Sequence, residues 1–135
     1  MKDKKLPVAY IAFEVLNLLK RLRICRIFAE RKGFDMKIKI YLDDRRPLPE
    51  SKGRCVRTYE DCIYALKIFK EVEFISLDYD LGTPKGGYDV LVFMLENGNK
   101  VEHINIHSDH SIGVPRMREF IRENFPNSRL TFNPL

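Results

Sequence analysis

The chain has few cysteines. Its 135 residues include three, Cys25, Cys55 and Cys62, an odd number without a Cys-x-x-Cys spacing. This usage argues against a disulfide framework and favours the reducing cytoplasm, with the cysteines acting as small buried hydrophobes. The histidines have no cysteine partner at a spacing typical of zinc sites. Stability must therefore come from a hydrophobic core, for which 44% hydrophobic residues are sufficient.

A long hydrophobic run is also missing. The most apolar stretch, residues 8–19, is too short to span a membrane and contains Glu14 and Asn17. No small-residue cleavage site follows it, which disfavours a secretory signal. We therefore expect no transmembrane segment.

The chain also lacks an excess of positive charge outside its N-terminal segment. The net charge is +5, but residues 1–35 hold nine Lys and Arg against four Asp and Glu, whereas residues 36–135 hold fifteen of each. A balanced domain lacks the broad basic surface expected for binding a long duplex. A phosphorylated small molecule or an RNA terminus is the better-fitting partner.

The charge division also suggests two parts. Residues 8–19 are apolar and residues 20–32 are basic, which predicts one N-terminal helical extension over residues 1–35 that ends at Gly33. It can be interpreted as a docking helix, a membrane-surface helix, or sequence upstream of a natural start at Met36. We favour the last, because the domain over residues 36–135 reads as complete.

Strands and helices alternate within that domain. Thr58 is a predicted N-cap, Gly98 is a predicted helix end, and the loop over residues 45–53 lacks helical periodicity. This alternation predicts an α/β fold with a doubly wound parallel five-stranded sheet, the first crossover helix being reduced to a loop. The predicted strands are 38–42, 55–57, 74–78, 103–107 and 129–132, and the predicted helices are 59–71, 88–97 and 115–124.

Carboxylates follow two of these strands. Asp43 and Asp44 follow the first strand, and Asp78 and Asp80 follow the third. Parallel strands end at one edge, so the four groups are expected to converge and to need a cation between them. Mg²⁺, or Mn²⁺, suits oxygen ligands and leaves positions for a substrate phosphate. Asp is also common after strands because it favours turns, so neither pair alone would identify a site.

The fourth strand is expected to bring further polar groups to this edge. His107 suits general acid/base work near neutral pH, and Ser108 is expected to hydrogen-bond a phosphate. Arg45 or Arg46 is expected to grip the phosphate bidentately, and Lys85 is a further candidate for substrate binding. The alternative is that these cations are solvent-exposed loop residues without a role in binding.

The motifs resemble those of receiver domains. The pair Asp43-Asp44 is similar to the receiver's metal-binding acidic pair, and Asp78 is similar to its phospho-acceptor. Receivers end strand four in Ser or Thr and strand five in Lys. Here strand four ends in His107-Ser108 and strand five has no Lys.

A divergent branch, the cyclic-phosphate processing receiver-like domains, is more similar over residues 36–125. The resemblance implies a receiver-like strand order of 2-1-3-4-5 and metal-assisted processing of cyclic phosphates on RNA ends or nucleotides. His110 and Arg116 stand where asparagines are expected. The motifs that carry the resemblance are Leu42-Asp43-Asp44-Arg45-Arg46-Pro47, Ser76-Leu77-Asp78-Tyr79-Asp80-Leu81-Gly82, Gly87-Tyr88-Asp89 and Asn105-Ile106-His107-Ser108, followed by Gly113 and Met117.

We therefore expect a Mg²⁺-dependent phosphoesterase. Asp43, Asp44 and Asp78 would hold the metal with Asp80 at its rim, Asp78 would take part in catalysis, and His107 would activate water or protonate the leaving oxygen. The alternative is a non-catalytic receiver-like module that binds phosphate, or that accepts a phosphoryl group on Asp78.

Overall fold

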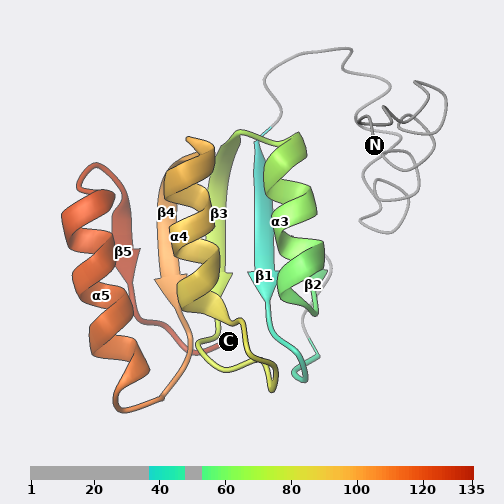
Figure 1. Ribbon diagram of the computed structural model, residues 1–135, viewed down its shortest axis with the longest axis vertical. Coiled ribbons are helices and arrows are strands. Elements are labelled where there is room, and N and C mark those ends of the chain that lie inside the picture. The colour runs from blue at the N-terminus through green and yellow to red at the C-terminus, as the bar shows by residue number, and fades with distance from the viewer. Residues whose placement is uncertain (1–36, 48–52) are drawn as a thin grey trace, which may run out of the picture. The chain divides into compact units, whose positions relative to one another are not determined.

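The computed structural model describes residues 37–47 and 53–135 (Figure 1). The predicted N-terminal extension, 1–35, lies outside the described residues, as does part of the predicted loop over 45–53. No helix occurs in the described part of that loop, residues 45–47 and 53. Within the described ranges, no helix is long and apolar enough to cross a membrane.

Five parallel strands form one sheet in the order β2-β1-β3-β4-β5, which confirms the expected topology. Three helices follow β2, β3 and β4 along the chain. The strands are β1 (Ile38–Leu42), β2 (Arg54–Val56), β3 (Glu71–Leu77), β4 (Lys100–Ile106) and β5 (Arg129–Thr131), and the helices are α3 (Tyr59–Ile68), α4 (Gly87–Asn97) and α5 (Gly113–Asn124).

The predicted caps of two helices are present. Thr58 begins α3 by accepting a hydrogen bond from the backbone N–H of Asp61 at 3.0 Å. Gly98 ends α4 in the left-handed region, at φ 73°, where a residue without Cβ is least strained. Helix α3 is shorter than predicted, because Phe69 adopts an extended conformation while its N–H still bonds to Ala65.

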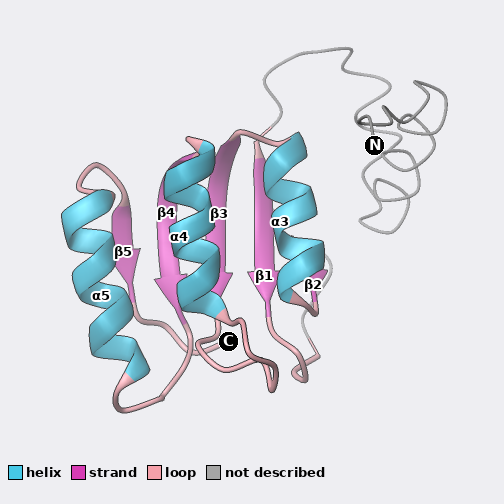
Figure 2. Ribbon diagram, viewed as in Figure 1, coloured by secondary structure: helices cyan, strands magenta, loops and turns pink. Residues whose placement is uncertain are grey.

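The three helices lie on one face of the sheet, and the core is between them and the strands (Figure 2). In β1 the alternate residues Ile38, Ile40 and Leu42 are buried, as the period of two for strand side chains requires. Across the described residues, no helix covers the opposite face (Figure 2). The largest core side chains include Ile40, Leu42, Leu66, Ile75, Leu77, Leu91, Met94, Ile104, Ile106, Met117 and Ile121.

The topology fixes where a site would form. β1 and β3 are neighbours in the middle of the sheet, and the chain leaves β1 toward β2 but leaves β3 toward β4. In open α/β sheets, ligands bind outside the carboxyl ends of the strands where the connections diverge in this way.

Candidate functional site

The carboxyl ends of β1, β3 and β4 bring three side chains together. The backbone N–H of Asp78 bonds to Leu42 at 3.2 Å, and that of His107 bonds to Leu77 at 3.1 Å, so the sheet pairing continues past each strand end. Asp43, Asp78 and His107 each place one potential ligand atom within 4.8 Å of the other two. We call these residues the Asp–Asp–His group. The predicted convergence of Asp43, Asp78 and His107 is therefore present.

Asp43 is the most constrained member, with a side chain that is 1% exposed. Its Oδ1 accepts the backbone N–H groups of Arg45 and Arg46 at 2.9 and 2.8 Å. Its Oδ2 accepts a hydrogen bond from Nη1 of Arg46 at 3.2 Å and lies 3.0 Å from Nε2 of His107. A carboxylate offers about four acceptor positions, so every position on Asp43 is engaged.

The pKa values of Asp43 and Asp78 are shifted in opposite directions. Burial alone would raise the pKa of Asp43, but the N–H donors of Arg46 and Arg45 and the neighbouring His107 outweigh it, so the pKa is lowered. Burial and then the negative charge of Asp43 raise the pKa of Asp78, against smaller opposing effects of His107 and Arg46. Burial and the neighbouring charge of Asp43 therefore disfavour the ionised form of Asp78.

His107 has a completely buried side chain. Nε2 faces Asp43, and Nδ1 lies 2.7 Å from Oγ of Ser76. Burial lowers the pKa of His107, and the attraction of Asp43 and Asp78 for the charged form offsets only part of this. The ring is therefore neutral near pH 7, and both nitrogens already have partners.

The other two predicted metal ligands lie outside the Asp–Asp–His group. Asp44 is partly buried and pairs with Nε of Arg45 at 3.6 Å. Asp80 is exposed, and its Oδ1 accepts the backbone N–H of Gly82 at 2.8 Å. Their part in metal binding stays a prediction.

The predicted phosphate-binding residues differ in their surroundings. Arg46 is half exposed and bonds to Asp43, whereas the side chain of Arg45 is 86% exposed. Oγ of Ser108 accepts the backbone N–H of His110 at 3.2 Å. Lys85 lies 5.0 Å above the ring of Tyr59, at the start of α3. Arg46 is thus the cation of this set that contacts the Asp–Asp–His group.

The two residues that depart from the family pattern have local partners. Nδ1 of His110 accepts the backbone N–H of Gly113 at 2.9 Å, where α5 begins. Arg116 lies 4.0 Å above the ring of Tyr88.

Two glycines let α4 pack directly on the loop that carries Asp78. A Cβ atom on Gly86 would lie 2.1 Å from the carbonyl oxygen of Tyr79, and one on Gly87 would lie 2.2 Å from that of Asp78. No side chain fits at such distances. The motif Gly86-Gly87 therefore sets the position of the Asp78 loop against the helix.

Sequence reasoning missed three residues that support the site. Ser76 and Asn105 are buried polar residues on β3 and β4, and Ser76 contacts His107. Nη1 of Arg57 donates to the backbone oxygens of Asp43 and Arg46 at 3.0 and 2.7 Å. A signal existed for the first two, since each is a polar residue between two apolar residues near the end of its strand.

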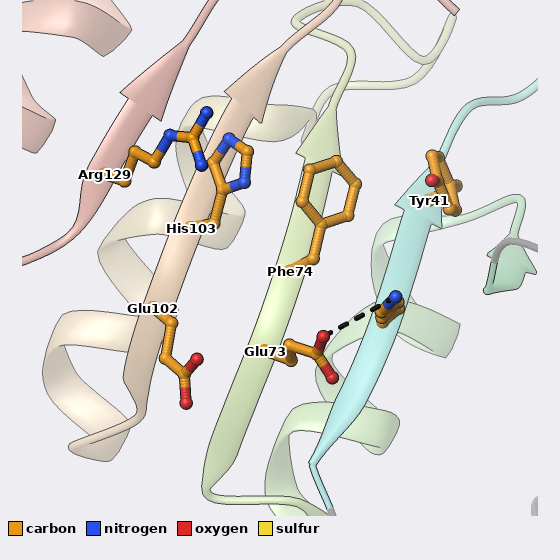
Figure 3. A pocket seen from close by; sticks show the side chains of 7 residues that line it. Tyr41, Glu73, Phe74, Glu102, His103 and Arg129 are labelled. Atoms are coloured by element: carbon orange, nitrogen blue, oxygen red, sulfur yellow. Dashed lines mark ion pairs between the residues drawn. The ribbon is translucent and has the colours of Figure 1, made fainter.

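A pocket of about 420 Å³ lies away from the Asp–Asp–His group, on the face of the sheet opposite the helices (Figure 3). Its rings pack in a row, with the centroids of Tyr41 and Phe74 at 5.3 Å and those of Phe74 and His103 at 4.8 Å. None of the predicted site residues lines this pocket. Its lining consists of Lys39, Tyr41, Glu73, Phe74, Glu102, His103 and Arg129.

A parallel sheet in the order 2-1-3-4-5, with an acidic group at the carboxyl ends of β1 and β3, defines a receiver-like domain. The family model of the cyclic-phosphate processing receiver domain matches residues 38–123, so the chain belongs to this family. The match confirms the resemblance read from the motifs. A search of curated proteins and a search of solved structures each found no match.

Proposed function

We propose that this domain is a divalent-metal-dependent phosphoesterase that opens cyclic phosphates on nucleotides or RNA ends. The observation that carries the proposal is the placement of Asp43 and Asp78 within 4.8 Å of each other, in a chain of the cyclic-phosphate processing receiver family. Hydrolysis would attach a water oxygen to phosphorus and break one P–O bond to the ribose. The product would be a phosphomonoester and a ribose hydroxyl.

The residues at this edge fit a Mg²⁺ or Mn²⁺ ion. Asp43 and Asp78 supply carboxylate oxygens, the donors that these hard cations prefer, and burial and the charge of Asp43 raise the pKa of Asp78. Asp44 and Asp80 would complete the acidic rim. A bound ion would polarise a phosphoryl oxygen and offset the charge that develops on it.

Arg46 would bind the substrate phosphate. Its guanidinium now contacts Asp43 through Nη1 alone, at 3.2 Å. A cation on Oδ2 of Asp43 would release the guanidinium, whose planar donors match a phosphate bidentately. Arg45, Ser108 and Lys85 would contribute more peripheral contacts.

His107 would act through Asp43. A direct proton transfer to substrate would require the ring to give up its contact with Asp43 or Ser76, because both nitrogens are engaged and the side chain is buried. The proposal therefore assigns His107 to the support of Asp43.

A receiver-like switch that accepts a phosphoryl group on Asp78 is the second candidate. Its supporting observation is that Asp78 directly follows β3 and is only partly buried. The lysine that the receiver pattern places after strand five is absent here, where Phe132 and Asn133 follow β5. This departure favours the phosphoesterase.

Turnover tests the proposal. The purified full chain would be incubated with 2′,3′-cyclic nucleotides and with RNA oligonucleotides that end in a cyclic phosphate, in Mg²⁺ or in chelator. We expect Mg²⁺-dependent ring opening that is lost in Asp78→Asn. Asp109→Asn is the matched control, because Asp109 is exposed and stands outside the proposed site. Stable phosphorylation of Asp78 by acetyl phosphate, without turnover of any cyclic phosphate, would favour the switch.

A further inference from the structure

Polar side chains, all of them buried except the partly exposed Thr131, form a continuous hydrogen-bonded network across three strands. Asn105 lies between Ser76 and Thr131 in the sheet register. Its amide is 2.9 Å from Oγ of Ser76 and 2.7 Å from Oγ1 of Thr131. Ser76 in turn contacts His107 at 2.7 Å, and His107 contacts Asp43 at 3.0 Å. We call Thr131, Asn105, Ser76, His107 and Asp43 the polar network.

The backbone of Asn133 determines which way the Asn105 amide points. The N–H of Asn133 lies 2.8 Å from Oδ1 of Asn105, and the carbonyl oxygen of Asn133 lies 2.9 Å from Nδ2. A backbone N–H can only donate and a carbonyl can only accept. The amide oxygen must therefore face the N–H of Asn133, which leaves Nδ2 as the donor to Ser76.

The orientation of the Asn105 amide determines which atom donates in each of the next hydrogen bonds, from Ser76 to His107 and from His107 to Asp43. Oγ of Ser76 accepts from Asn105, so its own hydrogen is available to Nδ1 of His107. Nδ1 then acts as an acceptor, and the hydrogen of the neutral ring is on Nε2, where it donates to Asp43. The Asp43 carboxylate requires the same arrangement because it can only accept. Both ends of the polar network thus select one tautomer of His107.

We propose that Ser76 and Asn105 are positioning residues that keep the His107 hydrogen on Nε2, so that the ring orients Asp43 and is not a ligand of a metal at this edge. A metal-binding imidazole must offer a lone pair to the ion. Here the lone pair of Nδ1 receives the Ser76 hydrogen, and Nε2 carries hydrogen toward Asp43. The Asp–Asp–His group therefore supplies only its two carboxylates to a cation.

The consequence is a preference for hard cations. Oxygen-only sites suit Mg²⁺ and Mn²⁺, whereas imidazole nitrogen favours zinc, copper and nickel. The part of this inference that concerns metal rests on the proposed function. The part that concerns the His107 tautomer does not depend on metal; it stands on the hydrogen-bond geometry around a neutral ring.

The tautomer is testable in the metal-free full chain. Long-range ¹H–¹⁵N correlation spectra at pH 7.5 distinguish a ring nitrogen that carries hydrogen from one that does not. We expect His107 to carry hydrogen on Nε2 and none on Nδ1. A His107 ring with hydrogen on Nδ1 would overturn the inference.

Two variants test how the arrangement is set. Asn105→Asp replaces the donor to Ser76 by an acceptor, so the Ser76 hydroxyl should turn toward residue 105 and Nδ1 of His107 should gain hydrogen. Thr131→Val is the matched control, because it removes a partly buried hydrogen bond from the other end of Asn105 and should leave His107 unchanged. A folded Asn105→Asp protein with unaltered His107 signals would contradict the proposal. Should Asn105→Asp fail to fold, a wild-type His107 ring with hydrogen on Nδ1 would still overturn the proposal.

A second readout concerns the ligands. In the full chain with Mn²⁺, electron spin-echo modulation detects histidine nitrogen that is bound directly to the ion. We expect no such modulation, and its presence would overturn the inference. A chain that binds no Mn²⁺ at all would count against the proposed function, while the spectra of the metal-free wild type and of Asn105→Asp would still test the role of Ser76 and Asn105.

Discussion

Replacing Asp78 by Asn should stabilise the metal-free protein at neutral pH. One carboxylate oxygen of Asp78 lies within 4.8 Å of one carboxylate oxygen of Asp43. Two like charges at about 4 Å repel by about 4 kcal/mol at an effective dielectric constant of 20. The partial exposure of Asp78 and the nearby guanidinium of Arg46 screen most of this, leaving about 1 kcal/mol as for other solvent-accessible pairs. For a domain of this size, that corresponds to an increase in Tm of roughly 4–8 °C.

The pH dependence of this gain has a defined sign. The folded pKa of Asp78 is raised above its ordinary value of 3.8, so the ionised carboxylate destabilises the folded state at every pH above the folded pKa. Lowering the pH protonates Asp78 and removes the destabilisation. The advantage of Asp78→Asn should therefore be full at pH 7 and should disappear below the ordinary pKa of 3.8.

Thermal unfolding followed by circular dichroism in chelator, at pH 7 and at acid pH, measures both effects. Asp109→Asn is the control for the loss of one exposed carboxylate and should change Tm little. A lower Tm of Asp78→Asn at pH 7 would refute the reasoning, as would an advantage that is equally large at acid pH. Either result would mean that Asp43 and Asp78 do not repel each other in the folded protein.

Three further predictions concern metal, Arg46 and the N-terminal segment. Bound Mg²⁺ should raise the free energy of unfolding of the wild type by about 2.7 kcal/mol at 100 times Kd, and its Tm with it, and calorimetry should show no such gain for Asp78→Asn. Arg46→Gln should bind Mg²⁺ more tightly in titration calorimetry, because it removes a competing cation from Asp43, yet should bind inorganic phosphate more weakly; unchanged affinities would exclude this role. A chain that begins at Met36 should retain a cooperative thermal transition within a few degrees of the full chain, whereas loss of folding would show that residues 1–35 pack on the domain.

Much of the fold could be predicted because its signals are local. β1 has the predicted bounds, and Thr58 and Gly98 cap their helices as their side chains and backbone freedom suggest. The starts of β3 and β4 were missed by three residues because charged residues occupy them. Those residues join the sheet through pairing between strands, as in Glu71 with Lys100, which local patterns do not reveal.

The site was predictable only in part, for the same physical reason. Asp43, Asp78 and His107 converge because parallel strands end at one edge, a rule that needs only the strand assignments. The engagement of both nitrogens of His107 depends on the register between β3 and β4. The orientation of Asn105 depends on Asn133, which returns to the sheet after β5. Such contacts join residues far apart in the sequence and become visible only in the folded chain.

The most direct test of the proposed activity is ³¹P NMR of a 2′,3′-cyclic nucleotide incubated with the full chain. We expect the cyclic-phosphate signal to be replaced by that of a phosphomonoester in Mg²⁺, and to persist both in chelator and with Asp78→Asn. A cyclic-phosphate signal that persists unchanged in Mg²⁺ with every cyclic nucleotide and cyclic-phosphate RNA end would contradict the account.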